Sequence, residues 1–130
     1  MPKPSPLILL VEDEPGIRSL INETVEEAGF RIEAASNYAD GLVLLKNSLP
    51  AVLIANVLLP DGDGHKLAEA ARRLGVPTLL VSGHPEMIVE AEREGIPFLA
   101  KPFGLDKLKR VIQTLIKPIA GPFEQDCSAS

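Results

Sequence analysis

The sequence predicts an α/β fold in which a parallel sheet is covered by helices on both faces. Short apolar runs are typical of strands that are buried on both sides, and examples are Leu7–Val11 and the middle of Thr78–Ser82. Between these runs lie segments whose apolar residues follow the i, i+3, i+4 spacing of helices. Strands and helices that alternate in this way form parallel sheets, because each helix returns the chain across one face.

Five strands and five helices are expected, in strict alternation. The expected strands are Leu7–Val11, Phe30–Ala35, Val52–Asn56, Thr78–Ser82 and Phe98–Ala100. The expected helices cover residues 15–28, 38–47, 65–74, 85–94 and 105–116.

Turn and cap residues mark the ends of the elements in the first half of the chain. Pro15 suits the first turn of a helix, and Gly29 suits the position just after its end. The second strand leads into Ser36 and Asn37, a pair suited to capping the second helix. Pro50 then separates that helix from the third strand.

The second half of the chain continues the alternation. Residues 57–64 contain Pro60 and two Asp-Gly pairs, which are typical of a turn-rich loop. Gly75 ends the third helix, and the fourth helix has the weakest apolar pattern of the five. Pro118 is predicted to end the last helix, because proline cannot donate a backbone hydrogen bond.

The size of the chain fits one domain. It has 130 residues and a mass of 13.9 kDa. We expect the domain at residues 7–117, after an unstructured lead-in of residues 1–6 and before a flexible tail of residues 118–130. A chain of this length buries roughly two-thirds of its unfolded surface, so one core is sufficient without disulfides.

Composition excludes several functional classes. The net charge of −5, from 18 acidic and 13 basic side chains, leaves no basic stripe for direct nucleic-acid binding. Cys127 is the only cysteine, which rules out a disulfide framework or a cysteine-based zinc site. The first apolar run is too short for a signal-peptide core or a membrane span. We therefore expect a cytoplasmic protein that does not enter the membrane.

Polar side chains stand at the carboxyl ends of the predicted strands. Glu12 and Asp13 follow the first strand, Asn56 ends the third, Ser82 ends the fourth and Lys101 follows the fifth. In open parallel sheets, ligands bind beyond these ends, where the strand order reverses. The sequence therefore predicts that these side chains share one pocket.

The residue types indicate a pocket for a metal ion and a phosphoryl group. Mg²⁺ prefers oxygen ligands, which Glu12, Asp13 and a backbone carbonyl near Leu58 could supply. Lys101 and Ser82 are suited to holding the oxygens of a phosphoryl group. The set fits phosphoryl transfer to a side chain at the end of the third strand.

Residue 56 departs from this chemistry. A carboxylate at that strand end could attack phosphorus and also hold the cation, whereas the amide nitrogen of Asn56 has no lone pair available for attack. Asparagine keeps the shape and one acceptor oxygen of an aspartate, but not its negative charge. The sequence therefore predicts a pocket without its reactive carboxylate, and weakened binding of Mg²⁺.

Four motifs carry these residues in a fixed order. They are LLVEDE at residues 9–14, NVLLPDGDG at 56–64, LVSG at 80–83 and FLAKPF at 98–103. In this order and spacing they resemble the receiver domain of bacterial two-component response regulators, the family of the chemotaxis receiver. The resemblance covers residues 7 to about 117 and implies a flavodoxin-like, doubly wound (βα)5 fold with strand order 2-1-3-4-5.

The resemblance implies a role for each matching residue. Glu12 and Asp13 match the acidic pair that binds Mg²⁺, and Asn56 falls on the aspartate that accepts the phosphoryl group. Ser82 matches the hydroxyl residue that turns toward the phosphate. Lys101 matches the lysine that pairs with the phosphate, and its bond to the following proline matches the family's usual cis peptide.

The resemblance also implies partners and a working surface. A sensor histidine kinase or a phosphotransfer protein would be the upstream partner. The fourth helix, fifth strand and fifth helix would form the face that binds downstream partners or a second copy of the chain. Phe98 on the fifth strand matches the family's aromatic switch residue, although it fits a plain core position equally well.

Two alternatives stay open for the function. Within the receiver family, Asn56 fits either a naturally degenerate receiver or a substitution that locks the unphosphorylated state. Outside it, a small magnesium-dependent phosphatase or phosphotransferase could use the same kind of pocket. Such enzymes typically place two aspartates two residues apart near a strand end, where this chain has Asn56 and Leu58. We therefore expect a signalling module rather than an enzyme.

Three further polar residues are interpreted locally. Asp61 and Asp63 each precede a glycine and are expected to serve the turn geometry of the loop. His65 is expected near the start of a helix, and no partner for metal binding is visible in the sequence.

Overall fold

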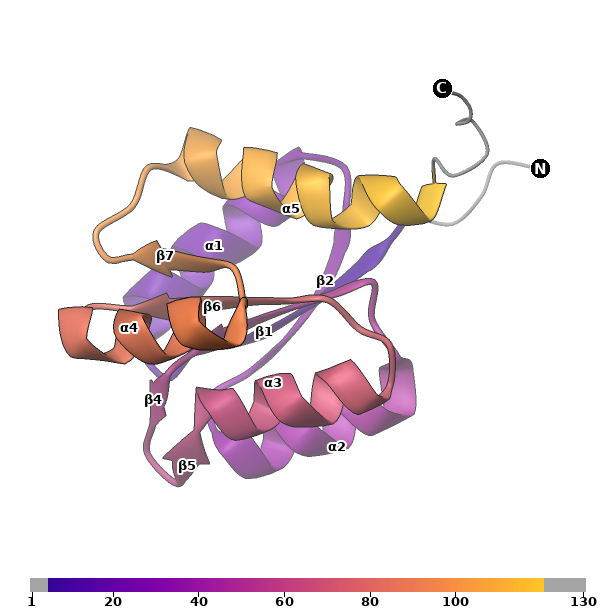
Figure 1. The fold of residues 1–130 in the computed structure, drawn as a ribbon. Helices are drawn as coiled ribbons and strands as arrows, with labels where there is room; N and C mark the ends of the chain where they lie inside the picture. Colours follow the sequence, from indigo (N-terminus) through magenta and orange to yellow (C-terminus); the bar gives the residue numbers. More distant parts are fainter. Residues whose placement is uncertain (1–4, 121–130) are drawn as a thin grey trace.

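The computed structural model describes residues 5–120, apart from the side chains of residues 85, 87, 88, 90 and 117–120. A central parallel sheet is flanked by helices on both sides (Figure 1). The strands of this sheet are β1 (Leu7–Val11), β2 (Arg31–Ala35), β3 (Val52–Asn56), β6 (Thr78–Ser82) and β7 (Phe98–Ala100). The helices are α1 (Pro15–Glu27), α2 (Tyr38–Ser48), α3 (Gly64–Arg73), α4 (Pro85–Glu94) and α5 (Leu105–Ala120).

The sheet order confirms the doubly wound topology. Its strands lie in the order β2-β1-β3-β6-β7, and every neighbouring pair is parallel. The order reverses beside β1, which pairs with both β2 and β3. The register aligns Val11 with Ala55 and Asn56 with Val81, so the carboxyl ends of the three central strands lie at one edge.

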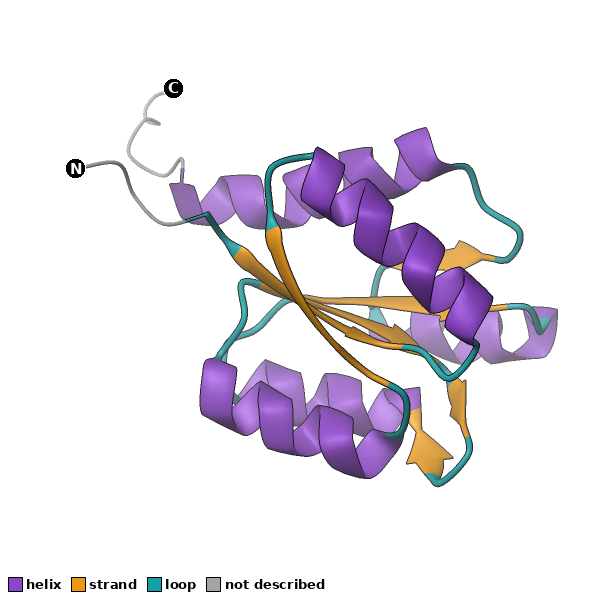
Figure 2. Cartoon of the chain, turned by 180° about the vertical axis from the view of Figure 1, so that it is seen from behind, coloured by secondary structure: helices purple, strands orange, loops and turns teal. Residues whose placement is uncertain are grey.

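The core consists of two apolar layers, one on each face of the sheet. Ile8 and Leu10 of β1 belong to the layer under α1 and α5, while Leu9 and Val11 belong to the layer under α2 and α3. Figures 1 and 2 show these two helix pairs on opposite sides of the sheet. The alternation follows from strand geometry, since successive side chains point to opposite faces.

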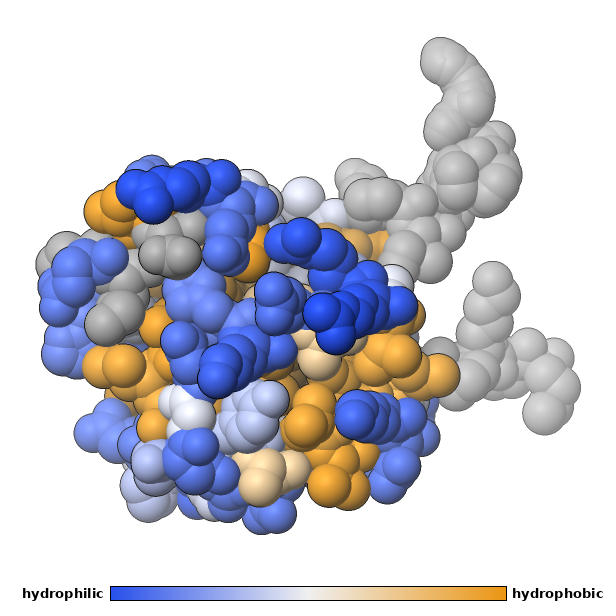
Figure 3. Space-filling model, turned by 60° about the horizontal axis from the view of Figure 1, so that its bottom comes forward, coloured by the Kyte–Doolittle hydropathy of each residue, from blue (hydrophilic) through white to orange (hydrophobic). Residues whose placement is uncertain are grey.

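The outer surface of the α2–α3 layer carries both polar and apolar side chains. Figure 3 views the molecule from this side and shows hydrophilic side chains beside a continuous apolar area. Exposed cations of this layer include Lys46 on α2 and Lys66, Arg72 and Arg73 on α3.

The structure differs from the sequence predictions at both ends of the domain. The backbone carbonyls of Ser5 and Pro6 accept hydrogen bonds from Arg31, so these two residues are anchored rather than part of a free lead-in. Helix α5 continues through Pro118 to Ala120, past its predicted end. A proline removes one hydrogen bond of a helix, and here that loss falls in the last turn. The remainder of the predicted tail, residues 121–130, lies outside the described residues.

The loop after β3 also contains structure that was not predicted. Strands β4 (Leu58–Leu59) and β5 (Gly62–Asp63) form a short antiparallel hairpin. The hairpin ends at Gly64, whose backbone N–H donates to the carbonyl of Val57 at 2.8 Å. The chain therefore closes back on the end of β3 before α3 begins.

Gly64 leaves no room for a side chain at this closure. A Cβ atom there would lie 2.3 Å from the carbonyl oxygen of Asn56 and 2.9 Å from the Cα of Val57. Both neighbours are backbone atoms, so relief requires the strand end itself to move. The glycine is thus a condition for the position of Asn56.

We expect Gly64→Ala to lower the free energy of unfolding by about 1–3 kcal/mol, the usual cost of overpacking. Gly16→Ala in α1 is the matched control, because nothing lies within 4 Å of a Cβ at Gly16. Alanine also favours a helix over glycine, so the control should lose no stability. Urea unfolding followed by circular dichroism measures both, and equal stability of the two variants would contradict this account of Gly64.

Candidate functional site

The strand ends bring together four of the five polar residues that were predicted to meet there. Glu12 and Asp13 follow β1, Asn56 ends β3 and Lys101 follows β7. The side-chain nitrogen Nδ2 of Asn56 donates to Glu12 Oε2 at 3.3 Å and to Asp13 Oδ1 at 3.1 Å. Lys101 Nζ lies 3.0 Å from the other oxygen of Glu12, Oε1. The predicted convergence of these residues is therefore present.

Glu12 is the centre of this cluster. Its side chain has no exposure to solvent, and a buried carboxylate is costly unless it is paired and hydrogen-bonded. Oε2 accepts hydrogen bonds from the Asn56 amide and from the backbone N–H of Glu14, the latter at 3.2 Å. Oε1 has Lys101 as its partner, in an ion pair rather than a well-aligned hydrogen bond. Both oxygens thus have a partner.

The orientation of the Asn56 amide follows from its neighbours. Its residue is 9% exposed, and two carboxylate oxygens face the same atom of the amide. A carboxylate accepts hydrogen bonds and cannot donate them, so only the NH₂ group can satisfy both. The reverse orientation would place the amide oxygen against two negative charges.

Ser82 lies beside this cluster but is hydrogen-bonded elsewhere. It is 2% exposed at the end of β6, and its backbone carbonyl accepts the N–H of Lys101 at 2.8 Å. Its hydroxyl oxygen accepts the backbone N–H of His84 at 3.0 Å and lies 3.4 Å from the His84 carbonyl. The hydroxyl therefore closes the turn that leads into α4.

The two remaining predicted residues, Leu58 and Phe98, contribute no side-chain contact to the cluster among the described interactions. Leu58 begins the β4–β5 hairpin with its side chain 43% exposed. Phe98 is half-buried and packs on the core layer under α2 and α3. The peptide bond between Lys101 and Pro102 is cis, as the resemblance implies.

The amide of Asn56 contacts both acids that were predicted to bind Mg²⁺. One oxygen of each acid, Glu12 Oε2 and Asp13 Oδ1, accepts a hydrogen bond from the amide NH₂ group. Among residues 5–120, no group of three or more His, Cys, Asp or Glu side chains is placed to hold a metal ion. The donor types suit Mg²⁺, and one hydrogen-bond donor already contacts an oxygen of each acid.

Sequence reasoning missed the main contact of Asp61. Its two carboxylate oxygens accept the backbone N–H groups of Tyr38, at 2.6 Å, and Ala39, at 3.1 Å. These are unpaired donors of the first turn of α2, which an acceptor can cap. The sequence suggested only a local turn role, because the partners lie more than twenty residues earlier. Asp63 does act locally, since it caps α3 by accepting the N–H of His65 at 2.8 Å.

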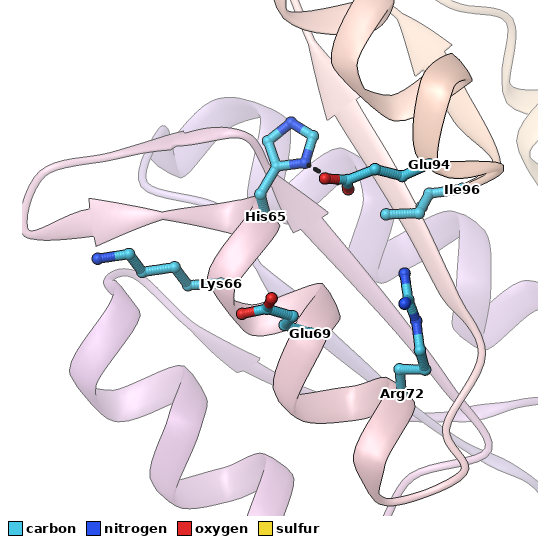
Figure 4. Close-up of a pocket in the computed structure, with 6 residues that line it drawn as sticks. All are labelled: His65, Lys66, Glu69, Arg72, Glu94 and Ile96. Carbon is cyan, nitrogen blue, oxygen red and sulfur yellow. Dashed lines mark ion pairs between the residues drawn. The ribbon is translucent and has the colours of Figure 1, made fainter.

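His65 has a partner that the sequence did not reveal. Its Nδ1 lies 3.4 Å from Oε1 of Glu94, at the end of α4, and Figure 4 marks this contact. The pair borders a hollow of about 330 Å³ lined by residues of α3 and by Glu94 and Ile96. None of the strand-end residues lines this hollow, so it is separate from the Asn56 cluster.

A family model for the response regulator receiver domain matches residues 8–113. The chain belongs to this family. Receiver domains are signalling modules of two-component systems. They interact with histidine kinases or phosphotransfer proteins and generally bind Mg²⁺ at the acceptor site.

Curated relatives support the same assignment. Response regulator Rre1 of Synechocystis sp. is 32% identical over 117 residues, which cover 84% of this chain and 51% of that protein. The KDP operon transcriptional regulatory protein KdpE of Escherichia coli is 29% identical over 114 residues, covering 85% and 51%. This chain therefore spans about half the length of these relatives.

Solved receiver structures share the whole fold. The receiver domain of the Francisella response regulator 1452 has a TM-score of 0.80 at 25% identity, covering 88% of this chain and 99% of that chain. A CheY-like receiver domain protein from Methanospirillum hungatei gives the same score and identity, covering 91% and 99%. In the part of this chain that the structure describes, no helix is long and apolar enough to cross a membrane.

The cap on α2 predicts a pH dependence. The N–H of Tyr38, followed by that of Ala39, holds the pKa of Asp61 below its ordinary value of 3.8. Because the folded pKa is the lower one, the contribution to stability is present above the unfolded pKa and is lost as pH falls through the folded pKa. We therefore expect Asp61→Asn to lower the urea midpoint at neutral pH, with a difference that narrows in acid.

Glu23→Gln is the control for the loss of one negative charge, because Glu23 is exposed on α1. It should leave the urea midpoint nearly unchanged. An NMR titration of the Asp61 carboxyl group measures the pKa directly. A midpoint at or above 3.8 would contradict the capping role.

Proposed function

We propose that this chain is a receiver module that does not accept a phosphoryl group and that acts through protein contacts. The observation that carries the proposal is the position of Asn56. It ends β3, lies at the edge where the strand order reverses, and donates to both acids of the cluster. This is where a receiver's acceptor carboxylate would be expected.

The chemistry of the amide accounts for the lack of phosphoryl transfer. An acyl phosphate forms when an ionised carboxylate attacks phosphorus. The amide nitrogen of Asn56 has no lone pair available for attack, and its two hydrogens face Glu12 and Asp13. A phosphoryl donor that reached the pocket would therefore meet no nucleophile at residue 56.

The same substitution would weaken Mg²⁺. In this proposal Glu12, Asp13, Asn56 and the carbonyl of Leu58 stand at the ligand positions of the family site. A neutral amide supplies less attraction for a divalent cation than a third carboxylate would. Weak rather than tight binding is therefore expected.

The remaining site residues lie at the positions of their proposed family roles, but their side chains make other contacts. Lys101 would pair with a phosphate and Ser82 would turn toward it, but Lys101 is paired with Glu12 and the Ser82 hydroxyl with His84. Phe98 would be the switch residue of β7. With no phosphoryl group to attract them, these side chains would retain the observed contacts.

The proposed partners follow from the family. A sensor histidine kinase or a phosphotransfer protein would bind upstream, and the face formed by α4, β7 and α5 would bind a downstream partner or a second copy. The net charge of −5 speaks against direct nucleic-acid binding by this domain. The matched relative KdpE is a transcriptional regulatory protein, and this chain covers about half of it. A cytoplasmic location remains a prediction.

Catalysis on external substrates is not part of the proposal. A phosphatase of the alternative class would need two carboxylates where the chain has Asn56 and Leu58. Magnesium-dependent hydrolysis of small phosphate esters by the purified chain would overturn this view.

Acetyl phosphate with Mg²⁺ tests the central proposal. We expect no covalent adduct on the unaltered chain, because residue 56 has no nucleophile. The Asn56→Asp variant should gain one labile phosphoryl group, seen by mass spectrometry of the intact protein. Asn56→Asp combined with Asp61→Asn is the control, and it should gain the same single group.

Three results would contradict the proposal. An adduct on the unaltered chain would show that the acceptor lies elsewhere, and loss of the adduct in the double variant would place it at Asp61. Absence of any adduct on Asn56→Asp would show that the surrounding pocket cannot support phosphoryl transfer.

A further inference from the structure

We infer that the Asn56 amide takes the place of the divalent cation, so that the acid pair is held together without metal and a cation must compete with the amide for the same oxygens. The inference rests on the proposed function, because it assumes that the family's cation would bind between Glu12 and Asp13. It goes further in assigning the amide a structural role in place of the cation's, rather than a mere loss of affinity.

The amide and a cation would use the same carboxylate oxygens. One nitrogen, Nδ2 of Asn56, lies 3.3 Å from Glu12 Oε2 and 3.1 Å from Asp13 Oδ1. A magnesium ion bound to these oxygens would lie about 2.1 Å from each oxygen that it contacts and would use the lone pairs that accept from the amide. Cation and amide therefore compete for the same two oxygens.

The residue at position 56 also sets the charge balance of the cluster. Glu12 and Asp13 carry two negative charges, and Lys101 supplies one positive charge at 3.0 Å from Glu12. An aspartate at residue 56 would add a third negative charge within hydrogen-bonding distance of the first two, which is unfavourable without a cation. The amide adds two donors and no charge, so it removes the repulsion that a cation otherwise has to offset.

The burial of Glu12 makes it costly to remove the amide from this carboxylate. Glu12 is fully buried and Asn56 is 9% exposed, so water has little access to the Glu12 side of the cluster. A buried carboxylate that loses one of its donors carries a desolvation penalty, and the amide is one of the donors to Glu12. To admit a cation, the amide would have to turn its NH₂ group away from both acids. The cation therefore has to displace hydrogen bonds that are already made. Only the part of its interaction free energy that exceeds that of these hydrogen bonds would appear as binding affinity.

A regulatory consequence follows for the receiver. Its site would have the same arrangement whether or not Mg²⁺ or a phosphoryl donor is present. Contacts on the α4–β7–α5 face would then be constant, and the output of the module would follow its concentration.

Thermal unfolding with and without magnesium tests the inference. With EDTA, the unaltered chain should unfold at a higher temperature than Asn56→Asp. Millimolar magnesium should raise the midpoint of Asn56→Asp by several degrees, roughly 3–6 °C for a domain of this size. The unaltered chain should shift by no more than about a quarter of that amount. Sodium chloride at matched ionic strength controls for general screening.

Asn56→Ala separates the two parts of the argument. It removes the donors without adding charge, so its midpoint in EDTA should lie below that of the unaltered chain. With no amide to displace, magnesium should raise its midpoint more than that of the unaltered chain. A second readout is the side-chain NH₂ signal of Asn56 in NMR spectra, which magnesium should leave in place.

Several outcomes would overturn the inference. Magnesium could stabilise the unaltered chain as much as Asn56→Asp, or could shift the Asn56 NH₂ signal at millimolar concentration. Asn56→Asp could also be as stable as the unaltered chain in EDTA. None of these results requires an adduct with acetyl phosphate, so the inference can fail while the proposed lack of phosphorylation holds. An adduct on the unaltered chain would instead contradict the proposed function.

Discussion

The buried carboxylate of Glu12 is the constraint on which the strand-end site depends. It has no contact with solvent, so its charge has to be balanced inside the protein. The balance comes from Lys101 after β7, the amide of Asn56 on β3, and the backbone of the residue that follows Asp13. Only aligned ends of parallel strands bring groups so distant in sequence within reach of one carboxylate. The fold and the site therefore depend on the same register.

Much of this arrangement could be predicted from the sequence, because its determinants are local and repetitive. Strands such as Leu7–Val11 and Val52–Asn56 were predicted with their observed bounds, since a strand buried on both faces is a short apolar run between polar breaks. The strand ends then placed Glu12, Asn56 and Lys101 at one edge, as the structure confirms. A polar residue directly after an apolar run was a sufficient signal.

The features that could not be predicted are of two kinds. Some are contacts between residues that lie far apart in the chain, and others depend on small differences in free energy between alternative local structures. Nothing in the sequence near Asp61 indicates that its carboxylate caps α2, and nothing near His65 indicates Glu94. The predicted end of α5 was wrong because Pro118 was expected to stop the helix. The helix continues for two residues beyond this proline. The hydroxyl of Ser82 was expected toward the pocket, and its bond to the next turn reflects the nearest available donor.

The cap that Asp61 places on α2 has a consequence for motion within the domain. The hairpin that leaves Asn56 is fastened to the first turn of α2, and α2 packs closely on β1 where Gly41 meets Val11. Residue 12 follows directly on that strand. A shift of α2 would therefore move both the hairpin after Asn56 and the strand that leads to Glu12, although α2 supplies none of the charged groups of the cluster.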